Sequence, residues 1–393
     1  MTVSRHRRRV STSGAALLSL GGLGLAAGLG VAGGVAIYHT TDGQVQGSDV
    51  PEDRFPATPT GLLAVVDDAG RLGSVAVFAV RPDGDGGAYD PAGGSIVPVP
   101  ASADASGGFG DERLPLDESV ALDGSGVLDL DVTSLLGVSI DAVSVITPGE
   151  LAAALDPLGT VEVDLPGGAA QLDGEELAAA LAARDAVSAS EAYPTHVAVW
   201  RAVAAAIGEG LDEPLTVPGA ASGSFRWLTA GTVGVTRLRA EAITDVRVNR
   251  RGADAVALDR AEVVTLFAHL APSRMAAPNL GPNFLLRSRF ASAQLPTGMT
   301  RYDVAYDATS RLLASEHNVV FVDTTAGDAD EVTLVEVADA ALAGEAHALE
   351  ALFGPVEVRV AERRVVGIDV AVTLGTEFFD APPATGAPET SGG

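Results

Sequence analysis

The sequence contains no cysteine and no lysine, and its 25 basic residues are all arginine. Without cysteine the chain can form neither a disulfide framework nor a thiolate metal site. Acidic residues outnumber basic ones by 52 to 25, which gives a net charge of −27 at pH 7. Because a surface that binds phosphate backbones needs clustered cations, this balance argues against nucleic acid as a partner.

The sequence also lacks the local motifs of common metal sites and of serine hydrolases. The histidines are scattered and show neither His-x-His nor His-x-x-x-His spacing, so no histidine metal site is indicated. Ser74 has no Gly-x-Ser-x-Gly context, which removes the serine-hydrolase interpretation. Aspartate and glycine alternate in 83–94, but without the spacing of an EF-hand calcium loop. We therefore predict no metal site from local motifs.

The N-terminus carries four arginines among its first nine residues, followed by an uncharged run. At about 1.5 Å per helical residue, that run can span a hydrocarbon core of ~30 Å. Arginines on one flank and Asp42 on the other predict that the N-terminus lies in the cytoplasm. A cleaved signal peptide is the alternative. The expected parts are a cytoplasmic basic segment (1–14), a single transmembrane anchor (15–37) and a linker (38–60) to an extracytoplasmic remainder.

Beyond residue 60, patterns typical of strands and helices alternate along the chain. Apolar runs predict strands at 61–66, 74–80 and 96–100, whereas the polar, acidic stretch 101–131 predicts an exposed loop. Helices are expected after three capping residues, namely Thr147, Asp173 and Asp259. This order predicts an α/β fold with a central sheet and helices packed on it, followed by a smaller α/β domain. The expected divisions are a first domain (61–210), a connecting region (211–284), a second domain (285–379) and a disordered tail (380–393).

The stretch 158–185 carries the most specific pattern of the chain. An alternating strand, Val161–Leu165, is followed by Pro-Gly-Gly, then by Leu172-Asp173-Gly174-Glu175 and a helical run that ends at Arg184. Strand, turn, Leu-Asp-Gly-Glu, helix and arginine together resemble the heart of the LytR-CpsA-Psr family of cell-envelope proteins. The ending Val-Ala-Val-Thr-Leu-Gly-Thr-Glu-Phe (370–378) looks like the C-terminal domain that often follows the LytR-CpsA-Psr domain.

The resemblance implies an α/β fold whose central sheet is mixed. It also implies a site for pyrophosphate and a divalent metal, and the chain departs from the family pattern there. Arg71 and Arg184 stand at family arginines and are the candidate remnant of an anion-binding site. At other functional positions of the family, the aspartates and arginines are replaced. The replacing residues are Gly73, Ala101, Ser102, Ala182 and His196.

Working family members move glycopolymers from polyprenyl-pyrophosphate carriers to peptidoglycan, with arginines on the pyrophosphate and carboxylates on the metal. Losing one interaction made mainly in a transition state costs about 10²–10³ in rate, so several losses together predict a non-catalytic relative. We expect a binding or scaffolding protein of the cell envelope, with a polyprenyl lipid or cell-wall glycopolymer as partner and no cofactor. An active phosphotransferase that uses magnesium is the alternative. A secreted envelope protein of only architectural similarity is a third interpretation.

Overall fold

The computed structural model describes residues 51–55, 57–67, 69–80, 93–106, 112–183, 188–208, 215, 217–219 and 233–381. From Glu52 onward the described residues belong to one compact unit. The expected basic segment, the transmembrane anchor and the tail from residue 382 lie outside the described residues. Within the described part of the chain, no helix is both long enough and apolar enough to span a bilayer.

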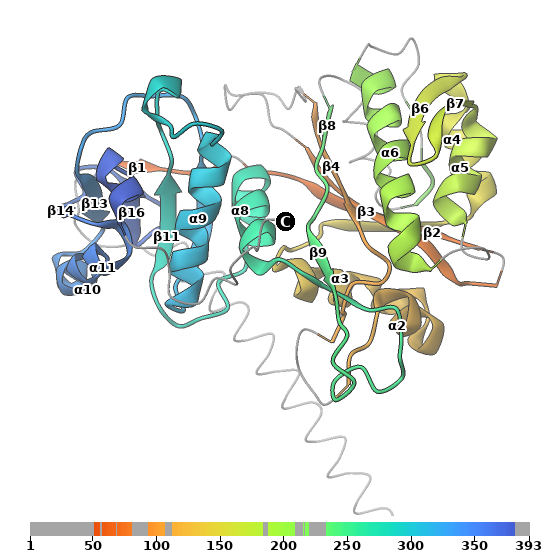
Figure 1. Ribbon diagram of the computed structural model, residues 1–393, viewed down its shortest axis with the longest axis horizontal. Coiled ribbons are helices and arrows are strands. Elements are labelled where there is room, and N and C mark those ends of the chain that lie inside the picture. The colour runs from red at the N-terminus through yellow and green to blue at the C-terminus, as the bar shows by residue number, and fades with distance from the viewer. Residues whose placement is uncertain are drawn as a thin grey trace, which may run out of the picture. The chain divides into compact units, whose positions relative to one another are not determined.

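The first of two five-stranded sheets has the strand order β5-β2-β3-β4-β8 (Figure 1). Strand β3 is antiparallel to both its neighbours, whereas β5 and β8 run parallel to β2 and β4 at the two edges. The sheet is therefore mixed, as the family resemblance implies. Its strands are β2 (Thr60–Val66), β3 (Leu72–Val80), β4 (Gly94–Val99), β5 (Ala142–Ile146) and β8 (Val233–Val235).

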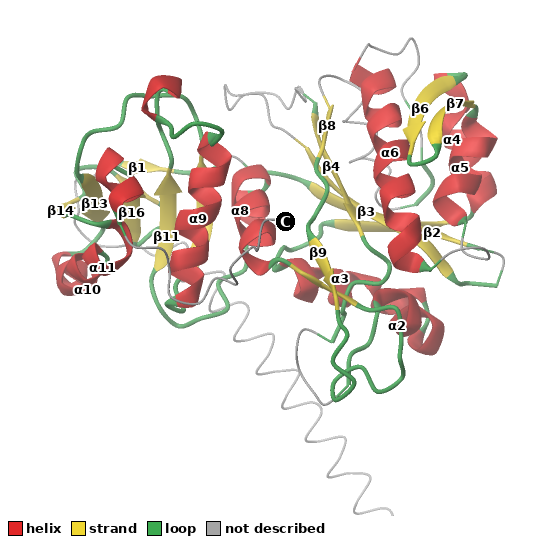
Figure 2. Cartoon of the chain, viewed as in Figure 1, coloured by secondary structure: helices red, strands yellow, loops and turns green. Residues whose placement is uncertain are grey.

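Helices cover both faces of this sheet (Figure 2). Alternate residues of β2 enter different cores: Leu63 and Val65 pack with α4, α5 and α6, while Leu62 and Ala64 pack with α2, α3 and α8. Because both faces are buried, the central strands read as continuous apolar runs. The helices are α2 (Leu116–Asp123), α3 (Leu128–Leu136), α4 (Pro148–Leu155), α5 (Gly174–Ala182), α6 (Ala189–Gly208) and α8 (Arg260–Leu270).

The expectation of an exposed loop at 101–131 is wrong. Residues 101–104 are buried, and α2 and the start of α3 occupy most of 116–131. Leu116 and Val120 on α2, and Leu128, Val132 and Leu136 on α3, repeat at intervals of four and enter the core. Acidic residues interrupt both helices, and one of them, Asp117, is itself buried, which concealed the periodicity.

Two small hairpins complete the region around the first sheet. Strands β6 (Val161–Leu165) and β7 (Gly168–Leu172) form one antiparallel pair directly before α5. Strands β9 (Ala240–Ala242) and β10 (Val256–Leu258) form the other, directly before α8. The sequence pattern predicts β6, and it indicates none of the other three strands.

The second sheet has the strand order β12-β11-β16-β13-β14. Strand β11 is parallel to β12 and β16, and α9 makes the connection from β11 to β12. Strand β13 is antiparallel to β16 and parallel to β14. The elements are β11 (Asn283–Arg287), α9 (Arg301–Ala314), β12 (Asn318–Asp323), β13 (Thr333–Val337), α10 (Ala343–Ala348), α11 (Glu350–Phe353), β14 (Val356–Val360) and β16 (Val370–Thr373).

Helix α8 belongs to both regions. Its residues Val263 and Phe267 pack into a core of the first sheet, and Val264 and Ala268 pack into the core of the second. In addition, β1 (Glu52–Asp53), from the expected linker, pairs with β15 (Arg364–Val365). The division into two domains stays a prediction, and these contacts are where it can be tested.

Candidate functional site

Arg71, the first of the two candidate anion-binding residues, lies in the turn between β2 and β3. Its Nε contacts Oδ2 of Asp67 at 2.6 Å, and its side chain is half exposed. The backbone N–H of Arg71 donates to Oδ1 of Asp67 at 2.8 Å. That backbone hydrogen bond, aided by the guanidinium, lowers the pKa of Asp67. Arg71 therefore closes this turn, and its expected role in binding an anion stays a prediction.

Gly73 and Ala182, two of the replaced positions, lie against each other. A Cβ placed on Gly73 would lie 2.8 Å from Cα of Ala182 and 2.9 Å from the carbonyl oxygen of Leu181. Real Cβ atoms do not approach backbone this closely, so strand β3 and the last turn of α5 are in direct backbone contact. There is no room at position 73 for the aspartate that the family pattern would place there.

Helix α5 is held in that position by its start as well as by its end. Asp173 accepts from the backbone N–H of Glu176 at 3.0 Å, and the Glu176 carboxylate accepts from the N–H of Asp173 at 3.1 Å. This reciprocal cap confirms Asp173 as the N-cap. A Cβ on Gly174 would lie 2.9 Å from the carbonyl oxygen of Ala152, so α5 also makes a close contact with α4.

Ala101 and Ser102 follow β4 and are buried. The carbonyl of Ala101 accepts from the N–H of Asp117, and the carbonyl of Ser102 accepts from the N–H of Val256, both at 2.9 Å. The Ser102 hydroxyl lies 3.2 Å from the hydroxyl of Ser190 at the start of α6. Both positions are thus committed to packing and to backbone contacts, and neither carries a charge.

His196 lies on α6 and is 3% exposed. Burial lowers its pKa to about 4, so the imidazole is neutral at physiological pH. Its Nε2 makes no hydrogen bond with any residue that the structure describes. A neutral buried histidine cannot supply the positive charge that the family pattern would place here. Arg184, the second candidate anion-binding residue, lies outside the described residues.

Taken together, the described members of the predicted site form no charged pocket. The structure brings Gly73 and Ala182 into contact, and places Ser102 beside the helix that carries His196. Among the residues that the structure describes, no group of three or more histidine or carboxylate side chains could hold a metal ion. Whether magnesium plays a part therefore stays a prediction.

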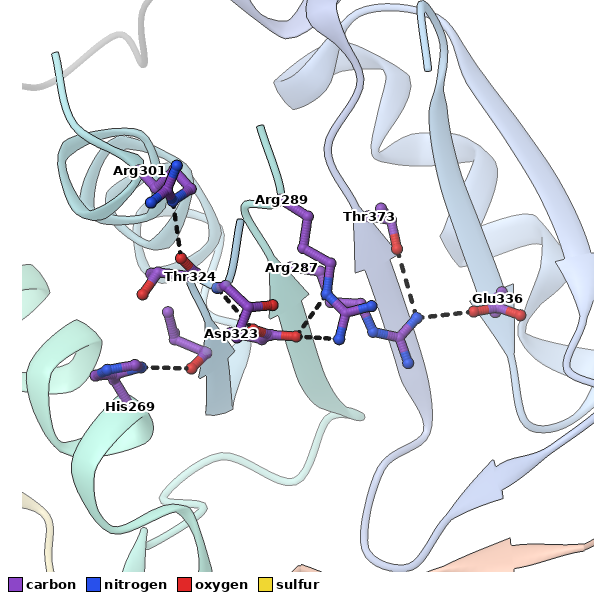
Figure 3. Close-up of polar contacts among 10 residues, drawn as sticks. His269, Arg287, Arg289, Arg301, Asp323, Thr324, Glu336 and Thr373 are labelled. Carbon is purple, nitrogen blue, oxygen red and sulfur yellow. Dashed lines mark hydrogen bonds and ion pairs between the residues drawn. The ribbon is translucent and has the colours of Figure 1, made fainter. Parts of the chain in front are cut away.

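The second sheet carries a polar cluster that sequence reasoning missed (Figure 3). It lies at the carboxyl ends of the parallel strands β11, β12 and β16. Arg287 donates to Glu336 at 2.9 Å and approaches the Thr373 hydroxyl at 3.4 Å. Arg289 donates from Nε to Asp323 at 2.7 Å. Burial would raise the pKa of Asp323, but hydrogen bonds from Thr325 and Arg289 outweigh it, and the pKa is lowered.

Strand carboxyl ends at a reversal of strand order commonly bind ligands in α/β sheets. Here α9 connects β11 to β12 on one side, and β16 lies on the other. Arg287 and Arg289 are already paired with carboxylates, so an incoming anion would have to compete with Glu336 and Asp323. The cluster as it stands is a set of ion pairs. The sequence does contain a signal for this cluster, because a charged or hydroxyl residue stands at or just after the end of each of these buried strands.

Comparisons with known proteins give structural likenesses only. No family model matches the chain, and no curated protein matches it. The crystal structure of B. subtilis TagT covers 55% of this chain and 96% of its own, at 14% identity and a TM-score of 0.38. The LytR-CPS2A-psr family protein YwtF (TagT), solved with bound octaprenyl pyrophosphate lipid, covers 56% and 90%, at 16% identity and a TM-score of 0.38. Lin1025 from Listeria innocua covers 54% and 96%, at 16% identity and a TM-score of 0.36. Solved LytR-CpsA-Psr structures are thus among those to which this chain is similar.

Proposed function

We propose that this chain is a membrane-anchored, extracytoplasmic LytR-CpsA-Psr-like protein that binds or scaffolds in cell-wall glycopolymer assembly and does not catalyse transfer. The order of sequence motifs supports the family part of the proposal. The observation that carries the non-catalytic part is the contact between Gly73 and Ala182, where the family pattern has a carboxylate and a guanidinium.

Transfer from a pyrophosphate carrier needs cations on the phosphates and oxygens around a divalent metal. Aspartate at position 73 would require α5 to move away from β3, because even a Cβ there would lie 2.8 Å from Ala182 Cα. Position 101 likewise has no space for a charged side chain, since Ala101 lies in the core and is only 2% exposed. Restoring catalysis would thus require a repacked helix and sheet, which goes well beyond a few surface substitutions.

Binding an apolar chain requires none of these charges. Burial of apolar surface contributes about 25 cal/mol per Å², independently of any phosphate contact. A protein whose predicted site has lost most of its charge can therefore still hold a prenyl chain or a partner protein of the envelope. This is why binding or scaffolding is the function that we favour.

The alternative is an active phosphotransferase with a rearranged site. It is favoured by the retention of Leu172-Asp173-Gly174-Glu175, Arg71 and Arg184 in the sequence. Under this alternative, Arg184 would contact the pyrophosphate. The two proposals make opposite predictions for a single assay.

The assay uses the full-length chain in detergent, a polyprenyl-pyrophosphate-linked glycopolymer, a peptidoglycan acceptor and magnesium. We expect no transfer above background, whereas a fluorescent prenyl-chain analogue binds. The matched variants are Arg184→Ala and Arg247→Ala, the latter removing a guanidinium that is 86% exposed and paired with Asp245. Turnover that Arg184→Ala abolishes and Arg247→Ala retains would establish the phosphotransferase instead.

Membrane anchoring through 15–37 is tested separately. A reporter fused after Asp42 should lie outside the cytoplasmic membrane, because the arginine cluster precedes the apolar run. The protein should sediment with membranes at its full mass. A shortened, freely soluble product would favour the cleaved signal peptide.

A further inference from the structure

A cavity of about 340 Å³ opens between α3, the start of α8 and the β9–β10 hairpin. None of the predicted site residues that the structure describes lines it. Its wall is largely apolar, and the apolar side chains come from all three elements and from the turn that follows β9. Those that matter here are Leu135, Ile243, Val248, Leu258 and Val263. Pockets of 300 to 1,000 Å³ with apolar walls and a few polar groups are typical small-molecule sites.

Two arginines and one aspartate provide the charge of this cavity. Arg113 donates from Nη1 to Oδ2 of Asp104 at 3.1 Å, and both side chains are largely buried. Oδ1 of Asp104 also accepts from the Ser106 hydroxyl at 2.5 Å. This pair is therefore neutral and satisfied on its own. It leaves Arg260 as an uncompensated positive charge among the described residues of the wall.

Arg260 makes no hydrogen bond or ion pair with the residues that the structure describes. Its guanidinium lies beside Gly137, where a Cβ would be 3.6 Å from Nη2 and 3.7 Å from Nη1. Burial lowers the pKa of Arg260, so the surroundings disfavour the charge that it carries. Arg260 is nevertheless an exposed residue, so solvent reaches its side chain, and an anion that enters the cavity can reach the guanidinium as well.

The nearby carboxylates are already engaged elsewhere. Asp259 accepts from the N–H groups of Ala261 and Glu262 through Oδ1, and from the Tyr306 hydroxyl through Oδ2. The Glu262 carboxylate accepts from the backbone N–H of Arg239 and pairs with its side chain. In a chain of net charge −27, the described residues of the cavity wall thus carry a local positive excess.

The end of α3 gives Arg260 a favourable neighbour but uses none of its donors. Gly137 is the left-handed C-cap of α3, and its carbonyl accepts from the N–H of Ala276 at 2.8 Å. A cation near a helix C-terminus is stabilised by the helix dipole. That explains why an arginine is tolerated here, and it leaves the five N–H groups of the guanidinium able to bind a ligand.

We propose that this cavity binds a small amphipathic anion, with a carboxylate or phosphate head on Arg260 and an apolar body against Leu135, Ile243 and Leu258. A planar guanidinium grips either head in bidentate fashion, and the Ser134 hydroxyl lines the same cavity. The proposal is independent of the function proposed above, because it uses no residue of the predicted site.

The test titrates the full-length chain in detergent with hexyl phosphate, hexanoate, inorganic phosphate and hexanol, followed by ¹H–¹⁵N NMR or calorimetry. We expect hexyl phosphate and hexanoate to bind at least tenfold more tightly than inorganic phosphate or hexanol. Arg260→Gln should weaken both amphipathic anions at least tenfold and leave hexanol unchanged. Arg247→Gln, at an exposed arginine outside the cavity, should leave all four unchanged.

A second variant keeps the test valid if Arg260→Gln folds poorly. Ala257 is exposed at the cavity, so Ala257→Glu places a carboxylate there to compete for Arg260 without disturbing the core. It should also weaken both amphipathic anions. Equal binding of hexanol and hexyl phosphate would overturn the anion site, and equal binding of inorganic phosphate would overturn the apolar subsite. Unchanged binding in both variants would overturn the location.

Discussion

In and around the first sheet, most positions that the family pattern would fill with charge hold small or neutral residues, and only Arg71 and Arg184 keep a charge. In the second sheet, arginines and carboxylates gather where the parallel strands end. Gly73 and Ala182 bring β3 and α5 into backbone contact, whereas Arg287 and Glu336 hold neighbouring strands by an ion pair at 2.9 Å. The predicted site of the first region is therefore closed by steric fit, whereas the polar cluster of the second sheet is held by ion pairs. The two should respond to different kinds of substitution.

The difference also separates packing from binding. A contact between backbones leaves no volume for a ligand, so the closed part of the first region serves as scaffold. Ion pairs at strand ends remain polar and partly exposed, as Arg287 and Glu336 are. They can exchange partners only if an incoming anion replaces the lost charge, because a largely buried pair that loses one member leaves an uncompensated charge. New recognition chemistry is more easily gained at such an edge than at the contact between Gly73 and Ala182.

The largest effect that we predict comes from Gly375→Ala in the second region. A Cβ at Gly375 would lie 2.5 Å from the carbonyl oxygen of Glu331 and 2.6 Å from that of Val332. Because backbone would have to move, unfolding should become easier by more than about 3 kcal/mol. Chemical denaturation measures this change in the free energy of unfolding. Gly344→Ala is the matched control, because nothing lies within 4 Å of a Cβ there.

The same variant tests whether the two regions are independent. Since α8 packs into both cores, amide exchange should accelerate in β2 and β3 as well as in β11 and β12. Exchange confined to the second sheet would instead favour two autonomous domains, as the sequence predicts.

The next effect depends on pH and concerns His196. Its pKa is lowered from 6.5 to about 4 in the folded chain, so the unfolded chain binds a proton more readily between these values. Stability should therefore be complete above pH 6.5 and fall by about 3 kcal/mol as the pH approaches 4. His196→Gln should flatten this dependence. His347→Gln, at an exposed histidine, is the control and should keep the pH dependence of the wild-type chain. If the free energy of unfolding still fell steeply with pH in both variants, groups other than His196 would be responsible for the loss of stability.

A smaller effect is expected for Gly73→Ala, which tests the closure of the first region directly. With contacts of 2.8 Å to Ala182 Cα and 2.9 Å to Leu181 O, the added methyl group must push α5 from β3. We expect a loss of about 1–3 kcal/mol in denaturant unfolding. Gly126→Ala is the control, since a Cβ there meets nothing within 4 Å. Equal stability of the two variants would remove the steric argument against catalysis.

Local signals in the sequence predicted much of the fold. Thr147, Asp173 and Asp259 each accept from backbone N–H groups at a helix start, as their positions before apolar periodic runs indicate. Buried runs predicted β2 and β3 to within two residues. The failures were also local: acidic residues interrupt the apolar pattern of α2 and α3, and β7 has no β-branched residue to mark it as a strand.

The site was harder to predict, because its shape and chemistry depend on contacts between segments that are distant in the sequence. The sequence shows glycine at 73 and alanine at 182, but not that the two touch. Nor does it show that Arg260 lies in a cavity built from three elements, without a partner among the described residues. Motif comparison identifies replaced residues, and only tertiary packing shows whether the space that they leave is filled.

The smallest effect concerns Arg71, the retained arginine of the first region. Its guanidinium is half exposed and pairs with Asp67 across a tight turn, so solvent screens the pair. Arg71→Ala should cost only about 0.2–1 kcal/mol in denaturant unfolding at low salt, and less at 1 M salt because the Debye length falls to about 3 Å. Asp67→Asn should cost a similar amount, since it removes the same charge pair. Binding of a prenyl-chain analogue should change less than threefold in Arg71→Ala, because an apolar chain makes no use of a guanidinium at this turn. A tenfold loss of affinity for a prenyl pyrophosphate, with prenyl alcohol binding unchanged, would instead show that Arg71 still grips phosphate and that the first region has kept part of an anion site.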